Sequence, residues 1–236
     1  MQKAVPAFIA ILVLTVLAVA GVEGWQMFQE NRSAKAAQEY QTALDTAAKG
    51  DDAKAFQQFD DMAKHGGPYQ ALALMQQGGL RMDQNKAADA AALFDKAAAV
   101  SKNPLIADIA TLKAAYAVMD TAPLAQVEAK LTPLTAANRP YRVQAREALA
   151  MARLAAGKTA AAKADLVAVS LMQDTPDSAR QRAQAIISLI DSGTGAGLKK
   201  LSDDAKTATP LPLPGPPAGS QAPQGAPIQV QPEAAQ

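Results

Sequence analysis

The sequence contains no cysteine, only one histidine, and few aromatic residues, which make up 4% of the 236 positions. Without cysteine the chain can form no disulfide, no thiolate metal site and no cysteine nucleophile. The lone His65 cannot build a multi-histidine zinc site, and no G-x-x-x-x-G-K-[ST] phosphate loop occurs. These absences predict a chain that is not an enzyme and that needs no cofactor or metal.

A strong charge of either sign is also missing, because 23 basic and 22 acidic residues are interspersed along the chain. This balance gives no electrostatic basis for binding nucleic acid. β-branched and aromatic runs, which favour strands, are absent beyond Trp25. Alanine dominates instead, and it favours helices because it loses no side-chain entropy there. The composition therefore predicts an all-α fold.

The amino-terminal segment carries the one long hydrophobic run. Ala4 to Val22 is a stretch of 19 residues without a charge, and as a helix it would span about 28 Å, close to the hydrocarbon thickness of a bilayer. Trp25 follows, where an amphipathic aromatic suits the membrane interface. We predict a single transmembrane anchor at residues 1–25.

Two other interpretations of this segment stay open. Ala18-Val19-Ala20 before Gly21 is an A-x-A pattern at which a signal peptidase could cut, and this would release the remainder of the chain. A buried helix of a soluble domain is the third possibility. The anchor and the signal peptide both predict export of the rest of the chain.

Four prolines recur at intervals of 36 residues: Pro68, Pro104, Pro140 and Pro176. Seventeen residues after three of them stand residues that readily close a helix in the left-handed conformation: Asn85, Gly157 and Gly193. Gly50 lies one residue later in an earlier block without a proline. Since proline suits the first turn of a helix, each block is expected to open with proline, turn at Gly or Asn, and continue into a second helix.

Apolar residues within the blocks fall on one helical face, as in the run Leu105, Ile109, Leu112, Tyr116 and Met119. A helix-turn-helix unit of this length is typical of tetratricopeptide-like solenoids, in which neighbouring units stack to bury their apolar faces. We therefore predict a tetratricopeptide-like α-solenoid at residues 26–205. A helical bundle with chance proline spacing is the alternative.

Two details of the repeats lead to further expectations. Gly78 and Gly79 lie inside a predicted helix, where we expect close packing against the paired helix. The block at 104–139 has no glycine at its turn and contains Pro123 and Pro133, so its second helix should be short or displaced.

Residues 206–236 differ in composition, because eight of the fifteen prolines lie between Pro210 and Pro232, and Glu233 is the only charge after Thr207. Such a segment cannot bury enough apolar surface to offset the entropy of ordering it. We predict a disordered, proline-rich tail, either an inert spacer or a ligand for an aromatic groove.

Arginines gather on two of the predicted first helices. They are Arg142, Arg146, Arg153, Arg180 and Arg182. First helices line the concave side of such solenoids, where arginine could grip carboxylates of a partner. We predict Arg142, Arg146, Arg153 and Arg180 as partner-binding residues; a solubilising surface is the alternative.

Several short segments, in this order, resemble one known family: Gly24-Trp25, residues 36–41, residues 67–73, residues 85–88, residues 146–149 and residues 156–158. The order of parts is similar to that of the ancillary SecYEG translocon subunit family, the YfgM-like tetratricopeptide proteins of bacterial inner membranes. The resemblance implies an amino terminus inside the cell and a repeat domain in the periplasm. It also implies partners among Sec translocon subunits, periplasmic chaperones or exported clients.

The prediction as a whole is a membrane-anchored periplasmic scaffold that binds proteins but neither nucleic acid nor a small-molecule substrate. A signal-cleaved periplasmic adaptor in envelope assembly or cell division is one alternative. A non-catalytic spacer, or a subunit of an envelope enzyme complex, is another.

Overall fold

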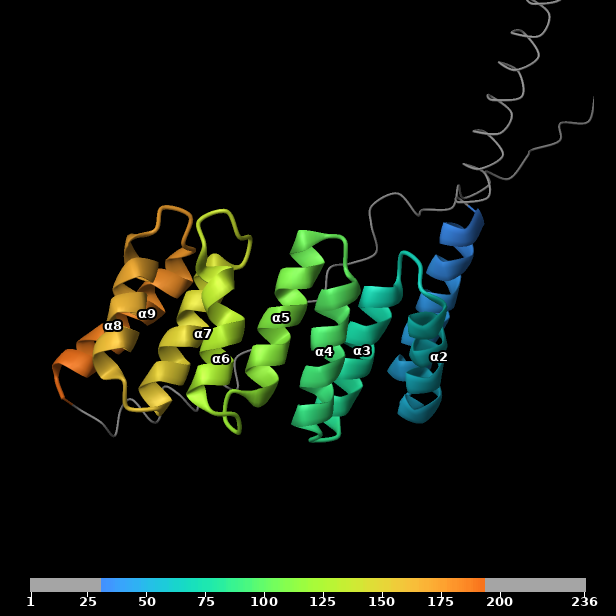
Figure 1. Cartoon of the computed structure of the whole chain (residues 1–236), viewed down its shortest axis with the longest axis horizontal. Coiled ribbons are helices and arrows are strands. Elements are labelled where there is room, and N and C mark those ends of the chain that lie inside the picture. Colours follow the sequence, from blue (N-terminus) through green and yellow to red (C-terminus); the bar gives the residue numbers. More distant parts are fainter. Residues whose placement is uncertain (1–30, 194–236) are drawn as a thin grey trace, which may run out of the picture. The chain divides into compact units, whose positions relative to one another are not determined.

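The computed structural model describes residues 31–193, and every regular element in that range is helical (Figure 1). The predicted anchor at 1–25 and the predicted tail at 206–236 lie outside the described residues. Between residues 31 and 193, no helix is both long enough and apolar enough to cross a membrane.

Residues 31–48 are helical, and the elements that follow are α2 (Asp52–His65), α3 (Gln70–Asp83), α4 (Ala87–Val100), α5 (Pro104–Val118), α6 (Leu124–Leu131), the 3-10 helix η1 (Thr132–Thr135), α7 (Arg142–Ala155), α8 (Thr159–Leu171) and α9 (Asp177–Asp191). Residues 38–211 belong to one compact unit, and residues 31–37 to another. The helix pairs between residues 38 and 193 lie in the first of these units.

Within this unit each helix packs against the next one in the chain (Figure 1). The first helices of the pairs are residues 38–48 (the part of helix 31–48 in this unit), α3, α5, α7 and α9, and the second helices are α2, α4, α6 and α8. The turns between first and second helices have positive φ at Gly50 (82°), Asn85 (59°) and Gly157 (74°), and Gly193 (69°) has positive φ directly after α9. The predicted repeat of helix pairs and its closing residues are confirmed.

The repeated prolines do not all stand at the same place in their helices. Pro104 is in the first turn of α5, and Pro176 directly precedes α9. Pro68 and Pro140 lie two residues before α3 and α7. There the Gln70 and Arg142 amides donate to carbonyls three residues back, so a turn precedes the helix that proline was expected to open.

The second helix of the block at 104–139 is short, as predicted. α6 has only eight residues between Pro123 and Pro133, and the chain continues as η1. Leu131 of α6 and Leu134 of η1 are nevertheless buried, and they join Leu112 of α5 and Leu149 of α7 in one apolar cluster. This short segment therefore keeps the two halves of the solenoid packed together.

The glycine pair in α3 is only half explained by close packing. A Cβ on Gly78 would lie 2.5 Å from the Phe94 ring of α4, so this position requires glycine. A Cβ on Gly79 would meet nothing within 4 Å, and the packing explanation is wrong for that residue.

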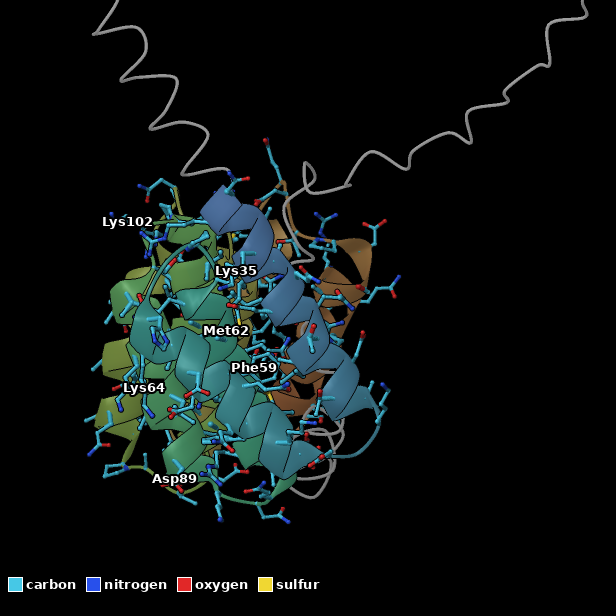
Figure 2. The ribbon with its side chains drawn as sticks, turned by 90° about the vertical axis from the view of Figure 1, so that its right-hand side faces the viewer. Lys35, Phe59, Met62, Lys64, Asp89 and Lys102 are labelled. Carbon is cyan, nitrogen blue, oxygen red and sulfur yellow. The ribbon has the colours of Figure 1, made fainter. Side chains whose placement is uncertain are left out.

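Phe59 and Met62 of α2 point into the core, whereas Lys64 and Asp89 stand at the outer surface of the second helices (Figure 2).

Candidate protein-interaction surface

Polar contacts join the first helices of successive pairs to one another. The Gln76 amide of α3 donates to the Tyr40 hydroxyl over 2.9 Å, and the two residues are 36 apart. The Arg182 guanidinium of α9 donates to the Glu147 carboxylate of α7 over 3.0 Å, and these are 35 apart. Equivalent positions of neighbouring repeats therefore meet, and together they form what we call the first-helix face.

Three consecutive first helices contribute to one cluster on this face: Tyr116 of α5, Glu147 of α7 and Arg182 of α9. Tyr116 is 43% exposed. Desolvation of its hydroxyl, with the nearby Glu147 carboxylate, raises the pKa of Tyr116 to about 12. Burial also raises the pKa of Glu147, against the opposing charge of Arg182. The cluster thus presents a tyrosine ring beside an arginine, and both residue types are enriched among those that dominate binding energy at protein interfaces.

A second aromatic group at the start of the unit is part of the core. The Tyr40 ring lies 5.8 Å from Phe59 and 5.1 Å from Tyr69, centroid to centroid. Tyr40 is only 5% exposed, and burial raises its pKa. This group therefore holds the first two helix pairs together and leaves little surface for a partner.

Two of the predicted arginines face the second helices. Arg153 Nε lies 2.8 Å from Glu128 of α6, and Arg153 Nη1 lies 2.6 Å from Asp165 of α8. Arg146 is 3.7 Å from the same Asp165. Desolvation raises the pKa of Asp165 more than the two arginines lower it. Arg146 and Arg153 therefore connect α7 to the helices on either side of it.

The other two predicted arginines bind the segment between α8 and α9. Arg142 Nη2 lies 2.5 Å from Asp174, in the segment between α8 and α9. Arg180 donates to the carbonyl oxygens of Met172 (3.2 Å) and Thr175 (3.3 Å) in the same segment. All four predicted arginines make contacts within the chain, and their role in binding a partner stays a prediction.

Of the Tyr116 cluster, Arg182 was noted in the sequence among the gathered arginines, whereas Tyr116 and Glu147 were not singled out as part of a site. Tyr116 belonged to a stripe expected to be buried, yet together with Leu105 it is exposed. Glu147 precedes Arg182 by 35 residues, which is close to the repeat length of 36. This spacing between opposite charges could have predicted that the two side chains meet.

One ion pair is buried near the start of α5. Asp108 is fully buried and pairs with Arg139, in the segment before α7. Burial raises the pKa of Asp108 despite the charge of Arg139. The Asp108 Oδ2 and Arg139 Nε atoms have no hydrogen-bond partner among the described residues. The pair links the segment between η1 and α7 to α5, although each of the two side chains keeps one polar atom without a hydrogen bond among the described residues.

No group of three or more metal-ligating side chains occurs within residues 31–193.

His65 is the last residue of α2, and its ring nitrogen lies 2.6 Å from the Asp61 carbonyl oxygen. A histidine at this position suits the carboxyl end of a helix dipole.

The helix pairs and the linked first-helix face define a repeat protein of the tetratricopeptide class. A family model described as a tetratricopeptide repeat-like domain matches residues 3–164, more than half of the chain. The chain belongs to this family. Neither a curated protein nor a solved structure gives a significant match. Repeats of this class generally mediate protein–protein interaction and are typically non-catalytic.

Proposed function

We propose that the chain is a single-pass inner-membrane protein whose repeat domain lies in the periplasm, where it binds proteins beside the Sec translocon. The observation that carries the proposal is the extent of the family match. It begins at residue 3, inside the long apolar run, and continues through the helix pairs to residue 164. The apolar segment and the repeats therefore form parts of one family domain, as an anchored scaffold requires.

The first-helix face supports the binding part of this proposal. Its exposed components are the Tyr116 ring and the Arg182 side chain, which is 57% exposed. Hydrogen bonds from Arg182 to Glu147 hold the Arg182 side chain in place, and Tyr116 of α5 lies close to both residues. A preformed aromatic and cationic surface binds a peptide segment with little ordering cost. The resemblance to the translocon-associated family suggests Sec subunits, periplasmic chaperones or exported clients as the proteins bound.

The localisation is tested with the full-length chain tagged at its carboxyl terminus and expressed in a bacterial cell. We expect the full-length protein to remain in carbonate-washed membranes, because a 19-residue apolar helix is long enough to span the bilayer. Crosslinking in intact membranes should then capture translocon subunits or periplasmic chaperones, identified by mass spectrometry.

A shorter, soluble form would instead identify Ala20–Gly21 as a cleavage site. If that form also captured none of these proteins, the translocon assignment would fail. A variant with Ala20 replaced by leucine is the matched control, because it blocks the A-x-A pattern while preserving the apolar run. It should behave as the original chain does if the segment is an anchor.

A further inference from the structure

The arginines in the second half of the solenoid are paired with acids of their own chain. Six arginines lie from residue 139 to residue 182, all within the described part of the chain. The pairs are Arg139 with Asp108, Arg142 with Asp174, Arg146 with Asp165, Arg153 with Glu128 and Asp165, Arg180 with Asp177, and Arg182 with Glu147. None of these guanidinium groups therefore meets a partner as an uncompensated positive charge.

The pair on the first-helix face leaves one donor of its arginine open. Arg182 Nε and Nη2 donate to the Glu147 carboxylate over 3.2 and 3.0 Å. The Glu147 side chain is 19% exposed, whereas that of Arg182 is 57% exposed. Arg182 Nη1 donates to no acceptor among the described residues. This nitrogen can therefore still donate to a neutral acceptor, such as a main-chain carbonyl oxygen.

A charged ligand group gains little at this pair. A carboxylate brought to Arg182 would also lie beside Glu147, and repulsion from Glu147 would offset much of the attraction. A cation would be attracted by Glu147 and repelled by Arg182. Either charge would in addition lose part of its hydration, which costs more than the desolvation of a neutral carbonyl group. The pair therefore favours an uncharged ligand.

Two exposed apolar side chains lie on the same side of α5. Leu105 is 41% exposed and Tyr116 is 43% exposed. They are 11 residues apart, which is about three helical turns, or about 16 Å along the helix axis. An extended chain advances about 3.3 Å per residue, so about five residues reach from one side chain to the other. The spacing suits an extended segment that carries apolar side chains.

We propose that the first-helix face between α5 and α9 selects an extended, uncharged polypeptide segment of an unfolded client protein. This inference rests on the proposed function and names the chemistry of the segment bound. An apolar side chain of the segment covers the Tyr116 ring, and one of its main-chain carbonyl oxygens accepts from Arg182 Nη1. An unfolded client offers such carbonyl groups, whereas a folded protein has already paired most of its own.

Peptide binding by the full-length chain tests the selection. The chain is reconstituted in nanodiscs of neutral phosphatidylcholine, and empty nanodiscs are the blank. The probe is a peptide of about ten glycine and serine residues with two leucines about five residues apart, blocked ends and an uncharged dye. Two further versions carry aspartate or lysine in place of serine. At low salt, where exposed charges are least screened, the serine peptide should bind roughly fivefold or more tighter than either charged version.

Reciprocal substitutions separate the two charges of the pair. Glu147→Gln leaves Arg182 without its counter-charge, so the aspartate peptide should bind roughly fivefold or more tighter than it binds the original chain. Arg182→Gln leaves Glu147 uncompensated, so the lysine peptide should gain by a similar factor. Glu128→Gln is the matched control, because Arg153 keeps Asp165 and its side chain is only 22% exposed. This control should leave all three affinities unchanged.

Far-ultraviolet circular dichroism checks that each variant keeps its helices. If Glu147→Gln unfolds the chain, Arg182→Gln still decides the question, since that side chain is mostly exposed. Tighter binding of the aspartate peptide by the original chain would overturn the inference and leave the proposed protein binding in place. Unchanged affinities in both variants would also overturn it. If no peptide bound at all, the proposed function would lose its binding surface as well.

A truncated chain distinguishes a client from the chain's own tail. Residues 207–232 are uncharged too, so a chain ending at residue 206 is measured beside the full-length one. Both should bind the serine peptide with the same affinity. A tenfold gain on truncation would mean that the tail competes for this face, and the assignment of the face to a client segment would be wrong.

Discussion

Replacing Asp108 with alanine should lower the free energy of unfolding by about 2 to 4 kcal/mol. Asp108 is fully buried, and the substitution leaves the Arg139 guanidinium without its counter-charge. The loss falls below the upper end of values for broken buried pairs because the Arg139 side chain is 34% exposed and can gain water. Denaturant unfolding of the chain, followed by far-ultraviolet circular dichroism, measures the change.

The double substitution of Asp108 by leucine and Arg139 by methionine tests whether the two charged residues act as a pair. An apolar pair of similar volume removes the desolvation cost of both charges, so we expect a loss under about 1 kcal/mol, or a gain. The same unfolding measurement yields the coupling between the two sites. If the double variant lost as much as the sum of the Asp108→Leu and Arg139→Met single variants, Asp108 and Arg139 would not act as one unit.

Gly78→Ala should cost about 1 to 3 kcal/mol of unfolding free energy. The added methyl would lie 2.5 to 2.8 Å from three atoms of the Phe94 ring. Phe94 is only 3% exposed, so its ring cannot move away without disturbing the contact between α3 and α4. Thermal or denaturant unfolding should show the loss.

The neighbouring residue provides a control of opposite sign. Gly79→Ala meets nothing within 4 Å, so it should stabilise the chain by up to about 1 kcal/mol through the higher helix propensity of alanine. Gly78→Ala combined with Phe94→Leu should lose less than the sum of the two changes, since the smaller side chain relieves the overlap. Equal effects of alanine at positions 78 and 79 would contradict the packing described here.

The helix pairs could be predicted because their signals are local. Asn85 and Gly157 have positive φ where the repeat spacing placed them, and only such residues adopt that conformation readily. The shortness of α6 follows likewise from Pro123 and Pro133. The exact starts of α3 and α7 were displaced, because a hydrogen-bonded turn that contains Pro68 or Pro140 precedes each helix.

The functional surface was less predictable because it depends on contacts between distant helices. A one-face stripe in α5 suggested that Tyr116 is buried, but α5 has neighbours on several sides and its carboxyl end stays open beside Glu147 and Arg182. In the same way, the acids that bind Arg153 come from α6 and α8. Nothing in the sequence near Arg153 indicates which side of α7 faces them.

The most direct test of the central claim is site-specific photocrosslinking in intact membranes. A benzophenone amino acid replaces Tyr116 on the first-helix face or, as the control, Gln57 on the exposed outer face of α2. We expect position 116 to crosslink to Sec translocon subunits, periplasmic chaperones or exported proteins, and position 57 to give little product. If position 116 remains silent while position 57 captures these proteins, or if both capture them equally, the first-helix face is not the binding surface of this scaffold.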